Sequence, residues 1–316
     1  MKCLVLGGNG FIGTHLVDAL LEGGHFVRIC DRSPNRFNAT PQNVEYVEGE
    51  LGNYGLIQEA VEGMEVVFHL VSTTLPKTSN DDPIYDVRSN LIDTLQLLEA
   101  CVEAGVRKVV FASSGGTVYG EPQTMPITED HPTNPITSYG IVKLAIEKYL
   151  GLFNHLHSLD YTVLRISNLY GPYQNPVGQQ GAVTVFLHRL HAGRPITIWG
   201  DGSVVRDYLY VADLVEALKL AAEAETRQKV FNVGSGRGTS LNELVAIIAE
   251  VTGERPHVEY VAGRALDVPA NVLDVTGARE ALDWIPRSEI TEGIGRTWDW
   301  ILTLTQDDVE REITSR

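Results

Sequence analysis

Tyr139 and Lys143 are four residues apart, in a segment from Ser138 to His157 whose apolar spacing predicts a helix. Side chains at i and i+4 share one face of a helix, so the phenol and the ammonium are expected to be neighbours. A tyrosine phenol ionises near pH ~10 in water, and a nearby cation favours its phenolate form. We therefore expect Lys143 to lower the pKa of Tyr139 and Tyr139 to exchange protons. The same spacing occurs by chance in ordinary helices, so the interpretation needs support from elsewhere in the chain.

A glycine-rich turn near the N-terminus provides that support. It follows a short apolar run, Cys3 to Leu6, and opens a helical pattern from Ile12 to Glu22. Glycines in this context permit a tight turn and a close approach of a pyrophosphate to the backbone, while the helix N-terminus attracts the phosphate charge. The turn therefore predicts a dinucleotide site, and the residues expected to contact the cofactor are Gly7, Gly10, Phe11, Ile12 and Gly13.

An acidic residue stands at the end of the second predicted strand. Asp31 follows the apolar run Phe26 to Cys30, about 20 residues beyond the glycine turn, where a carboxylate can accept hydrogen bonds from the ribose hydroxyls. A carboxylate there repels a ribose 2′-phosphate, so NAD is favoured over NADP, although the neighbouring Arg32 weakens this preference. The alternative is an ordinary solvated aspartate in a turn.

Ser113 and Ser114 end the predicted strand Val109 to Ala112. Ligands of parallel sheets bind at the carboxyl ends of the strands, so a hydroxyl there is placed to share a hydrogen bond with a substrate oxygen. Capping of the strand end is the competing explanation.

Short apolar runs alternate with amphipathic helical segments through the first half of the chain, which predicts βαβ units and a doubly wound parallel sheet of the Rossmann type. We expect a cofactor-binding domain over residues 1–167, its sheet completed by later segments, and a smaller C-terminal lobe, mainly for substrate, over 168–316. The remaining predicted strands are Val66 to Leu70 and Thr162 to Ile166, and the remaining helices are Tyr54 to Val61 and Val87 to Ala104.

Composition narrows the classes of partner. The 316 residues carry a formal net charge of −16 and no cluster of basic residues, which argues against nucleic acid as a partner. The three cysteines are widely spaced and suggest neither disulfides nor a zinc site. No metal is expected. No apolar stretch is long enough for a signal peptide or a membrane span, so we expect a cytoplasmic protein without a membrane partner.

These motifs together resemble the extended short-chain dehydrogenase/reductase family and, within it, the sugar-nucleotide epimerases that are similar to UDP-glucose 4-epimerase. The resemblance extends from Gly7 to about Trp284. Besides the motifs above, it rests on Phe68-His69-Leu70, Asn90, Thr117 to Gly120, Leu164-Arg165, Asn168, Gly171-Pro172, Arg206-Asp207-Tyr208, Val211 with Asp213, Asn232-Val233-Gly234 and Arg264 with Asp267.

The resemblance implies roles for individual residues. It implies a catalytic triad of Ser114, Tyr139 and Lys143, and a cofactor, NAD, that takes a hydride from the sugar and returns it to the opposite face of a 4-keto intermediate. The residues that it places on the cofactor are Asp31, Arg32, Glu50, Leu51, Leu70, Asn90, Tyr139 and Lys143, in addition to the glycine turn. The residues that it places on the UDP-sugar are Thr117, Asn168, Arg206, Arg264, Asp267 and Asn271. It also implies a homodimer that pairs through the helices of 87–104 and 138–157.

Some residues depart from the family pattern. Glu50 replaces the usual aspartate beside the adenine, Val71-Ser72-Thr73 replaces small residues, and Gly115-Gly116 replaces a single residue. The last two changes leave the sugar open: glucose or galactose, their N-acetyl forms and their uronic acids all fit. A 4,6-dehydratase or decarboxylase of the same family is the alternative enzyme, although 115–117 lack the acid that those enzymes use. A non-catalytic NAD-binding protein is the alternative from another class, which intact Ser114, Tyr139 and Lys143 oppose.

Overall fold

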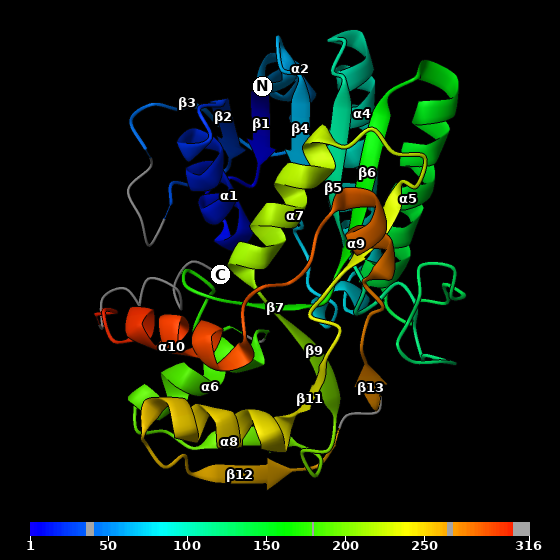
Figure 1. Ribbon diagram of the computed structural model, residues 1–316. Helices are drawn as coiled ribbons and strands as arrows, with labels where there is room; N and C mark the ends of the chain where they lie inside the picture. The colour runs from blue at the N-terminus through cyan, green and yellow to red at the C-terminus, as the bar shows by residue number, and fades with distance from the viewer. Residues whose placement is uncertain (36–40, 179, 264–267, 306–316) are drawn as a thin grey trace.

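A sheet of seven parallel strands forms the larger part of the protein (Figure 1). The computed structural model describes residues 1–35, 41–178, 180–263 and 268–305. The strands are β1 (Lys2–Leu6), β2 (Phe26–Asp31), β3 (Glu45–Glu48), β4 (Val66–His69), β5 (Lys108–Ser114), β6 (Asp160–Ile166) and β10 (Val230–Val233). Their order across the sheet is β3-β2-β1-β4-β5-β6-β10, so the direction of winding reverses between β1 and β4.

Helices cover both faces of this sheet, which confirms the predicted doubly wound Rossmann fold. One face packs against α1 (Phe11–Glu22) and α7 (Val211–Glu223), with α9 (Thr276–Leu282) beside β10. The other face packs against α2 (Tyr54–Val61), α4 (Asp93–Glu103) and α5 (Ser138–His157). Since both faces are covered, the strands are apolar along most of their length rather than alternating.

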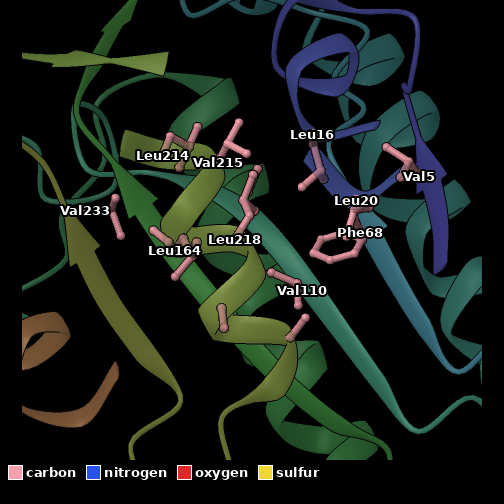
Figure 2. Close-up of a cluster of buried hydrophobic side chains, with 14 of the residues drawn as sticks. Val5, Leu16, Leu20, Phe68, Val110, Leu164, Leu214, Val215, Leu218 and Val233 are labelled. Atoms are coloured by element: carbon pink, nitrogen blue, oxygen red, sulfur yellow. The ribbon is translucent and has the colours of Figure 1, made fainter. Parts of the chain in front are cut away.

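The core on the first face joins segments that are far apart in the sequence. Figure 2 shows Leu16 and Leu20 of α1 and Leu218 of α7 directed toward Phe68 and Val110 of the central strands. Burial of such side chains stabilises each by roughly 1.5–3 kcal/mol relative to exposure. The first and seventh helices thus pack on one continuous apolar surface.

A smaller lobe lies below the sheet in Figure 1. Its strands are β7 (Asn168–Tyr170), β8 (Ile196–Trp199), β9 (Val205–Tyr210), β11 (Gly238–Ser240), β12 (Val258–Val261) and β13 (Ala270–Asn271). Its helices are α6 (Ala182–His191), α8 (Leu241–Thr252) and α10 (Ile290–Ile301), which share a third apolar cluster. The chain leaves the main sheet after β6, returns for α7 and β10, and leaves again, so both units are built from non-contiguous segments.

Two local elements differ from the sequence-based prediction. The helix expected over 87–104 begins earlier, with α3 (Pro83–Asp86), and continues through a π-helical turn, η2 (Val87–Ile92), into α4. The strand β3 was not predicted, because its sequence Glu-Tyr-Val-Glu carries two charges, which suit an edge strand exposed to water.

The three cysteines are free and buried. Within the described ranges, no helix has the length and apolar character that a bilayer crossing requires.

Candidate functional site

The glycine turn connects β1 to α1 at the carboxyl edge of the sheet. Gly7 has a φ of +79°, which favours glycine, and a Cβ at Gly13 would lie 2.1 Å from the Gly7 carbonyl oxygen. A Cβ at Gly10 would meet only that oxygen, at 3.2 Å, so this side of the turn is open. Gly13 is therefore needed for the packing of the turn itself, whereas Gly10 leaves room for a ligand close to the backbone.

Asp31 lies next to this turn, at the end of β2. Its Oδ2 accepts a hydrogen bond from the Asn9 N–H at 3.0 Å, and its Oδ1 accepts one from the Ser33 N–H at 3.3 Å. Burial raises the pKa of Asp31, while these backbone donors and the positive charge of Arg32 oppose the increase. The contact with Asn9 fixes the carboxylate against the glycine turn.

Tyr139 and Lys143 lie in the first turns of α5, beside the ends of β4 and β5. The Lys143 Nζ donates a hydrogen bond to the Ala112 carbonyl at 2.9 Å, and it lies 4.7 Å from the centre of the Phe111 ring. The same Nζ is 5.6 Å from the centre of the Tyr139 ring. The phenol and the ammonium are therefore neighbours, as the spacing predicts.

The electrostatics of this pair differ from the expectation that Lys143 lowers the pKa of Tyr139. Burial and, secondly, the negative charge of Asp86 raise the pKa of Tyr139 to about 12. Burial also lowers the pKa of Lys143 to about 8, against the opposing effects of Asp86 and Glu147. Tyr139 is thus protonated at neutral pH in the protein without cofactor, and an added positive charge is needed to favour its phenolate.

The two serines at the end of β5 point to opposite sides, as successive side chains of a strand do. Ser113 is buried and donates to the Glu147 carboxylate at 2.5 Å, and Glu147 forms a buried ion pair with Arg165 at 2.7 Å. Ser114 is only partly buried, and a Cβ at Gly116 would lie 3.9 Å from its hydroxyl oxygen. The structure therefore gives Ser113 a structural contact and leaves Ser114 at the strand end, near the start of α5.

A set of polar side chains that the sequence did not reveal holds the start of α5. The N–H groups of Ser138 and Tyr139 donate to Asn80 Oδ1 at 2.9 Å and Ser79 Oγ at 3.0 Å. The Ser138 hydroxyl donates to Asp86 Oδ2 at 2.6 Å. These contacts join residues 52 to 60 positions apart, so no local pattern could have indicated them.

The other predicted cofactor residues surround the same edge of the sheet. Leu70 follows β4 and is partly buried, Leu51 is buried among the side chains of α2, and Glu50 is exposed. Asn90 is buried in η2, where its Oδ1 accepts from the Thr73 N–H at 2.9 Å. Asn90 therefore holds the loop after β4.

The predicted substrate residues lie where the lobe meets the main sheet. Arg206 of β9 is opposite Asn271 of β13, and Asn168 of β7 is opposite Tyr208 of β9. Asn271 is 1% exposed and its amide donates to the Gly115 carbonyl at 3.1 Å, which links the lobe to the segment after Ser114. Arg264 and Asp267 lie outside the described residues.

Buried polar atoms without partners mark this junction. In the described part of the chain, Thr117 Oγ1, Tyr208 OH and Asn271 Oδ1 are buried and have no hydrogen-bond partner. Leaving such groups unpaired costs roughly 1–3 kcal/mol each, so a polar ligand that reached them would gain affinity.

Comparisons with known proteins agree with this geometry. Residues 3–234 match the family described as "NAD dependent epimerase/dehydratase family". The UDP-glucose 4-epimerase of Mycolicibacterium smegmatis is 40% identical over 313 residues, which cover 97% of this chain and 100% of that protein. The crystal structure of the Thermotoga maritima UDP-glucose 4-epimerase with UDP-glucose has a TM-score of 0.90 and 39% identity, covering 96% of this chain and 99% of the other. The crystal structure of the Thermus thermophilus UDP-glucose 4-epimerase with NAD has a TM-score of 0.90 and 35% identity, covering 96% of this chain and 100% of the other.

The fold and the site thus define a Rossmann enzyme with a tyrosine and a lysine at the carboxyl ends of its strands. The chain belongs to the NAD-dependent epimerase/dehydratase family. The residues present fit NAD: the turn is open at Gly10, and the Asp31 carboxylate is fixed beside it. No group of residues suited to hold a metal ion occurs among the described residues.

Proposed function

We propose that this protein is an NAD-dependent epimerase that inverts the C4 hydroxyl of a UDP-hexose. The observation that carries the proposal is the pairing of Tyr139 with Lys143 at the carboxyl end of β5, where the Lys143 ammonium donates to the Ala112 carbonyl. Similarity to UDP-glucose 4-epimerases over nearly the whole chain, at 40% and 39% identity, supports the same activity.

In the proposed reaction, Tyr139 accepts the proton of the C4 hydroxyl. It returns the proton after the 4-keto sugar has rotated to present its opposite face. The chemistry that NAD supplies is storage of the C4 hydride and its return to the opposite face, with no net redox change. Because the pKa of Tyr139 in the protein without cofactor is about 12, Tyr139 takes up this role only when positive charge is brought near it. Proton transfer is thereby confined to the complete complex.

Two further side chains support the proton transfer. Ser114 is proposed to hold the C4 oxygen while it exchanges its proton, because its hydroxyl is free of the Glu147 contact that occupies Ser113. Lys143 is proposed to donate a hydrogen bond to the nicotinamide ribose. Its ammonium must then either give up its hydrogen bond to the Ala112 carbonyl or donate to the ribose as well. Its remaining N–H groups make the addition possible.

The UDP-sugar is proposed to bind where β7, β9 and β13 meet the main sheet. A guanidinium can bind a diphosphate through two parallel hydrogen bonds, which is the role assigned to Arg206. Thr117, Asn168 and Asn271 are assigned to the sugar and the nucleotide, and the buried unpaired atoms of Thr117 and Asn271 support this assignment. Arg264 and Asp267 remain assigned to the nucleotide diphosphate by family resemblance.

A 4,6-dehydratase remains the second candidate, because it begins with the same oxidation at C4. It also needs a group that protonates the departing C6 hydroxyl. Residues 115–117 are Gly, Gly and Thr, so none of them supplies an acid. The local sequence therefore favours epimerisation.

A panel of UDP-hexoses, followed by NMR of the products, tests the proposal. Epimerisation predicts interconversion of C4 isomers at a constant amount of NADH, with UDP-glucose and UDP-galactose as the first pair. Formation of a 4-keto-6-deoxy sugar, seen as a loss of water by mass spectrometry, would establish the dehydratase instead. NADH that accumulates in proportion to product would establish a dehydrogenase.

We also propose a homodimer in the cytoplasm. Ile141, Tyr149, Leu152 and Leu156 of α5 are exposed and, at helical spacing, form one stripe. Ile84 of α3, 73% exposed, adds to the apolar surface on the adjoining helix. In a two-fold symmetric dimer, this stripe would pack against the same stripe of a second copy. Leu152→Glu is expected to give monomers in light scattering, whereas a wild-type monomer would contradict the proposal.

The free thiols fit a reducing compartment, which supports the proposed cytoplasmic location.

A further inference from the structure

Asp86 is a buried carboxylate next to the proposed catalytic pair. Asp86 is the last residue of α3 and is 1% exposed. Its Oδ2 accepts from the Ser138 hydroxyl and its Oδ1 from the Thr74 hydroxyl, each at 2.6 Å. A buried carboxylate is costly unless its oxygens are hydrogen-bonded, so these contacts fix the positions of the groups around it.

The same carboxylate is joined to Asn90. The Asn90 amide donates to Asp86 Oδ1 at 3.0 Å, while Asn90 Oδ1 accepts from the Thr73 N–H. Both residues lie at or in the π-helical turn η2, a kind of irregularity that recurs at functional sites. Asp86 therefore connects the loop after β4, which lies at the predicted cofactor site, with the residue that precedes Tyr139.

The charged and titratable groups that face the pair come from several elements. Lys143 lies on α5 itself with Glu147 one turn further on, and the charge of Glu147 is paired with Arg165. His69, at the end of β4, is neutral because burial and the nearby Lys143 lower its pKa to about 3. Asp86 is thus a negative charge that acts on both Tyr139 and Lys143.

We propose that Asp86 is a positioning residue: its hydrogen bonds to Ser138, Thr74 and Asn90 set the place of Tyr139 relative to the loop after β4 and hold a buried carboxylate beside the proposed catalytic pair. Its negative charge disfavours the Tyr139 phenolate and favours the Lys143 ammonium. Asp86 therefore favours the charged form of Lys143 and the neutral form of Tyr139, so that ionisation of Tyr139 depends on the bound cofactor. The inference rests on the proposed roles of Tyr139 and Lys143.

The test is the pH profile of Asp86→Asn in the enzyme loaded with NAD, with UDP-glucose as substrate. Asparagine keeps an acceptor for Thr74 and offers a donor to the Ser138 oxygen, so the local contacts survive while the charge is lost. Loss of a nearby negative charge lowers the pKa of any group beside it, so both limbs of the kcat profile are expected to move toward lower pH by about one unit. Limbs in the wild-type positions would overturn the charge effect.

Phenolate absorbance provides a readout that does not depend on turnover. The ultraviolet difference titration of Asp86→Asn, after subtraction of Asp86→Asn/Tyr139→Phe, should show Tyr139 ionising at lower pH than in the matching wild-type pair. Asp82→Asn is the matched control, because Asp82 is exposed and caps α3, which asparagine does equally well. The control should leave both the titration and the pH limbs unchanged; an equal shift in it would refute a specific effect of Asp86.

Ser138→Ala tests the positioning separately and does not require Asp86→Asn to fold. It removes one hydrogen bond to Asp86 and keeps the charge, so kcat is expected to fall about tenfold at unchanged pH limbs. Wild-type kcat in Ser138→Ala would overturn the positioning role. An active Tyr139→Phe would instead refute the proposed function, which keeps the two failures distinguishable.

Discussion

Replacement of Gly13 by alanine should damage the fold of the glycine turn before any ligand is bound. The added Cβ would lie 2.1 Å from Gly7 O, 2.6 Å from Gly8 Cα and 2.8 Å from Gly8 C. These neighbours are backbone atoms, which cannot move aside as the end of a side chain does. Overpacking of this kind costs about 1–3 kcal/mol, and the rigid neighbours place Gly13→Ala near the upper value.

Gly10→Ala is the matched variant in the same turn. Gly10 has φ −79° and ψ 178°, a conformation open to any residue, and an added Cβ would meet only Gly7 O at 3.2 Å. Loss of glycine at an N-cap position costs at most about 1 kcal/mol. The new methyl group projects from the open side of the turn, so we expect the affinity for NAD to fall about tenfold or more, which corresponds to about 1.4 kcal/mol.

Thermal melting of the cofactor-free proteins and calorimetric titration with NAD separate the two effects. At about 2 °C per kcal/mol for a chain of this size, Gly13→Ala should melt about 6 °C below the wild type, and Gly10→Ala should melt close to it. Both variants should bind NAD weakly. The reasoning is refuted if Gly13→Ala melts with the wild-type midpoint, or if Gly10→Ala loses as much stability as Gly13→Ala.

Three further substitutions test the assignment of the site. Asp31→Ala should weaken NAD binding and reduce discrimination against NADP, as titration with each cofactor will measure; a wild type that already prefers NADP would contradict the role of Asp31. Tyr139→Phe should fold and bind NAD while turnover falls by roughly 10²–10⁴-fold, and near-normal turnover would exclude Tyr139 as the proton carrier. Asn271→Tyr should exclude N-acetylated UDP-hexoses selectively, because the larger side chain would fill the space that family resemblance assigns to the C2 substituent of the sugar. Asn271→Leu is the control, since it removes the Gly115 contact at similar volume. An equal loss of both substrate classes in Asn271→Tyr would show that residue 271 does not sense the C2 substituent.

The elements that local patterns encode were predictable. Tyr139 and Lys143 are close because i and i+4 positions share a helix face, and Asp31 lies beside the glycine turn because the strands β1 and β2 are parallel neighbours. The buried strands are apolar runs whose ends the sequence gives to within a few residues, and α2 and α5 have the predicted bounds.

Contacts between distant segments were not predictable from these patterns. Asp86, Ser79 and Asn80 meet the start of α5 only in the folded chain, and nothing in their own sequence distinguishes them from ordinary loop and helix residues. The increase in the pKa of Tyr139 likewise depends on burial and on Asp86, which the spacing of Tyr139 and Lys143 does not reveal.

The return of the chain to the main sheet limits how the protein can be divided or recombined. A fragment that ended after β6 would lack β10, leaving the backbone edge of β6 unpaired, and would lack α7, uncovering Val110 and Leu164 (Figure 2). Exposed edges and apolar faces of this kind promote aggregation. A chimaera with a relative of different sugar preference therefore needs several crossover points, so that α7 and β10 stay with the sheet on which they pack while β7, β9 and β13 are exchanged together.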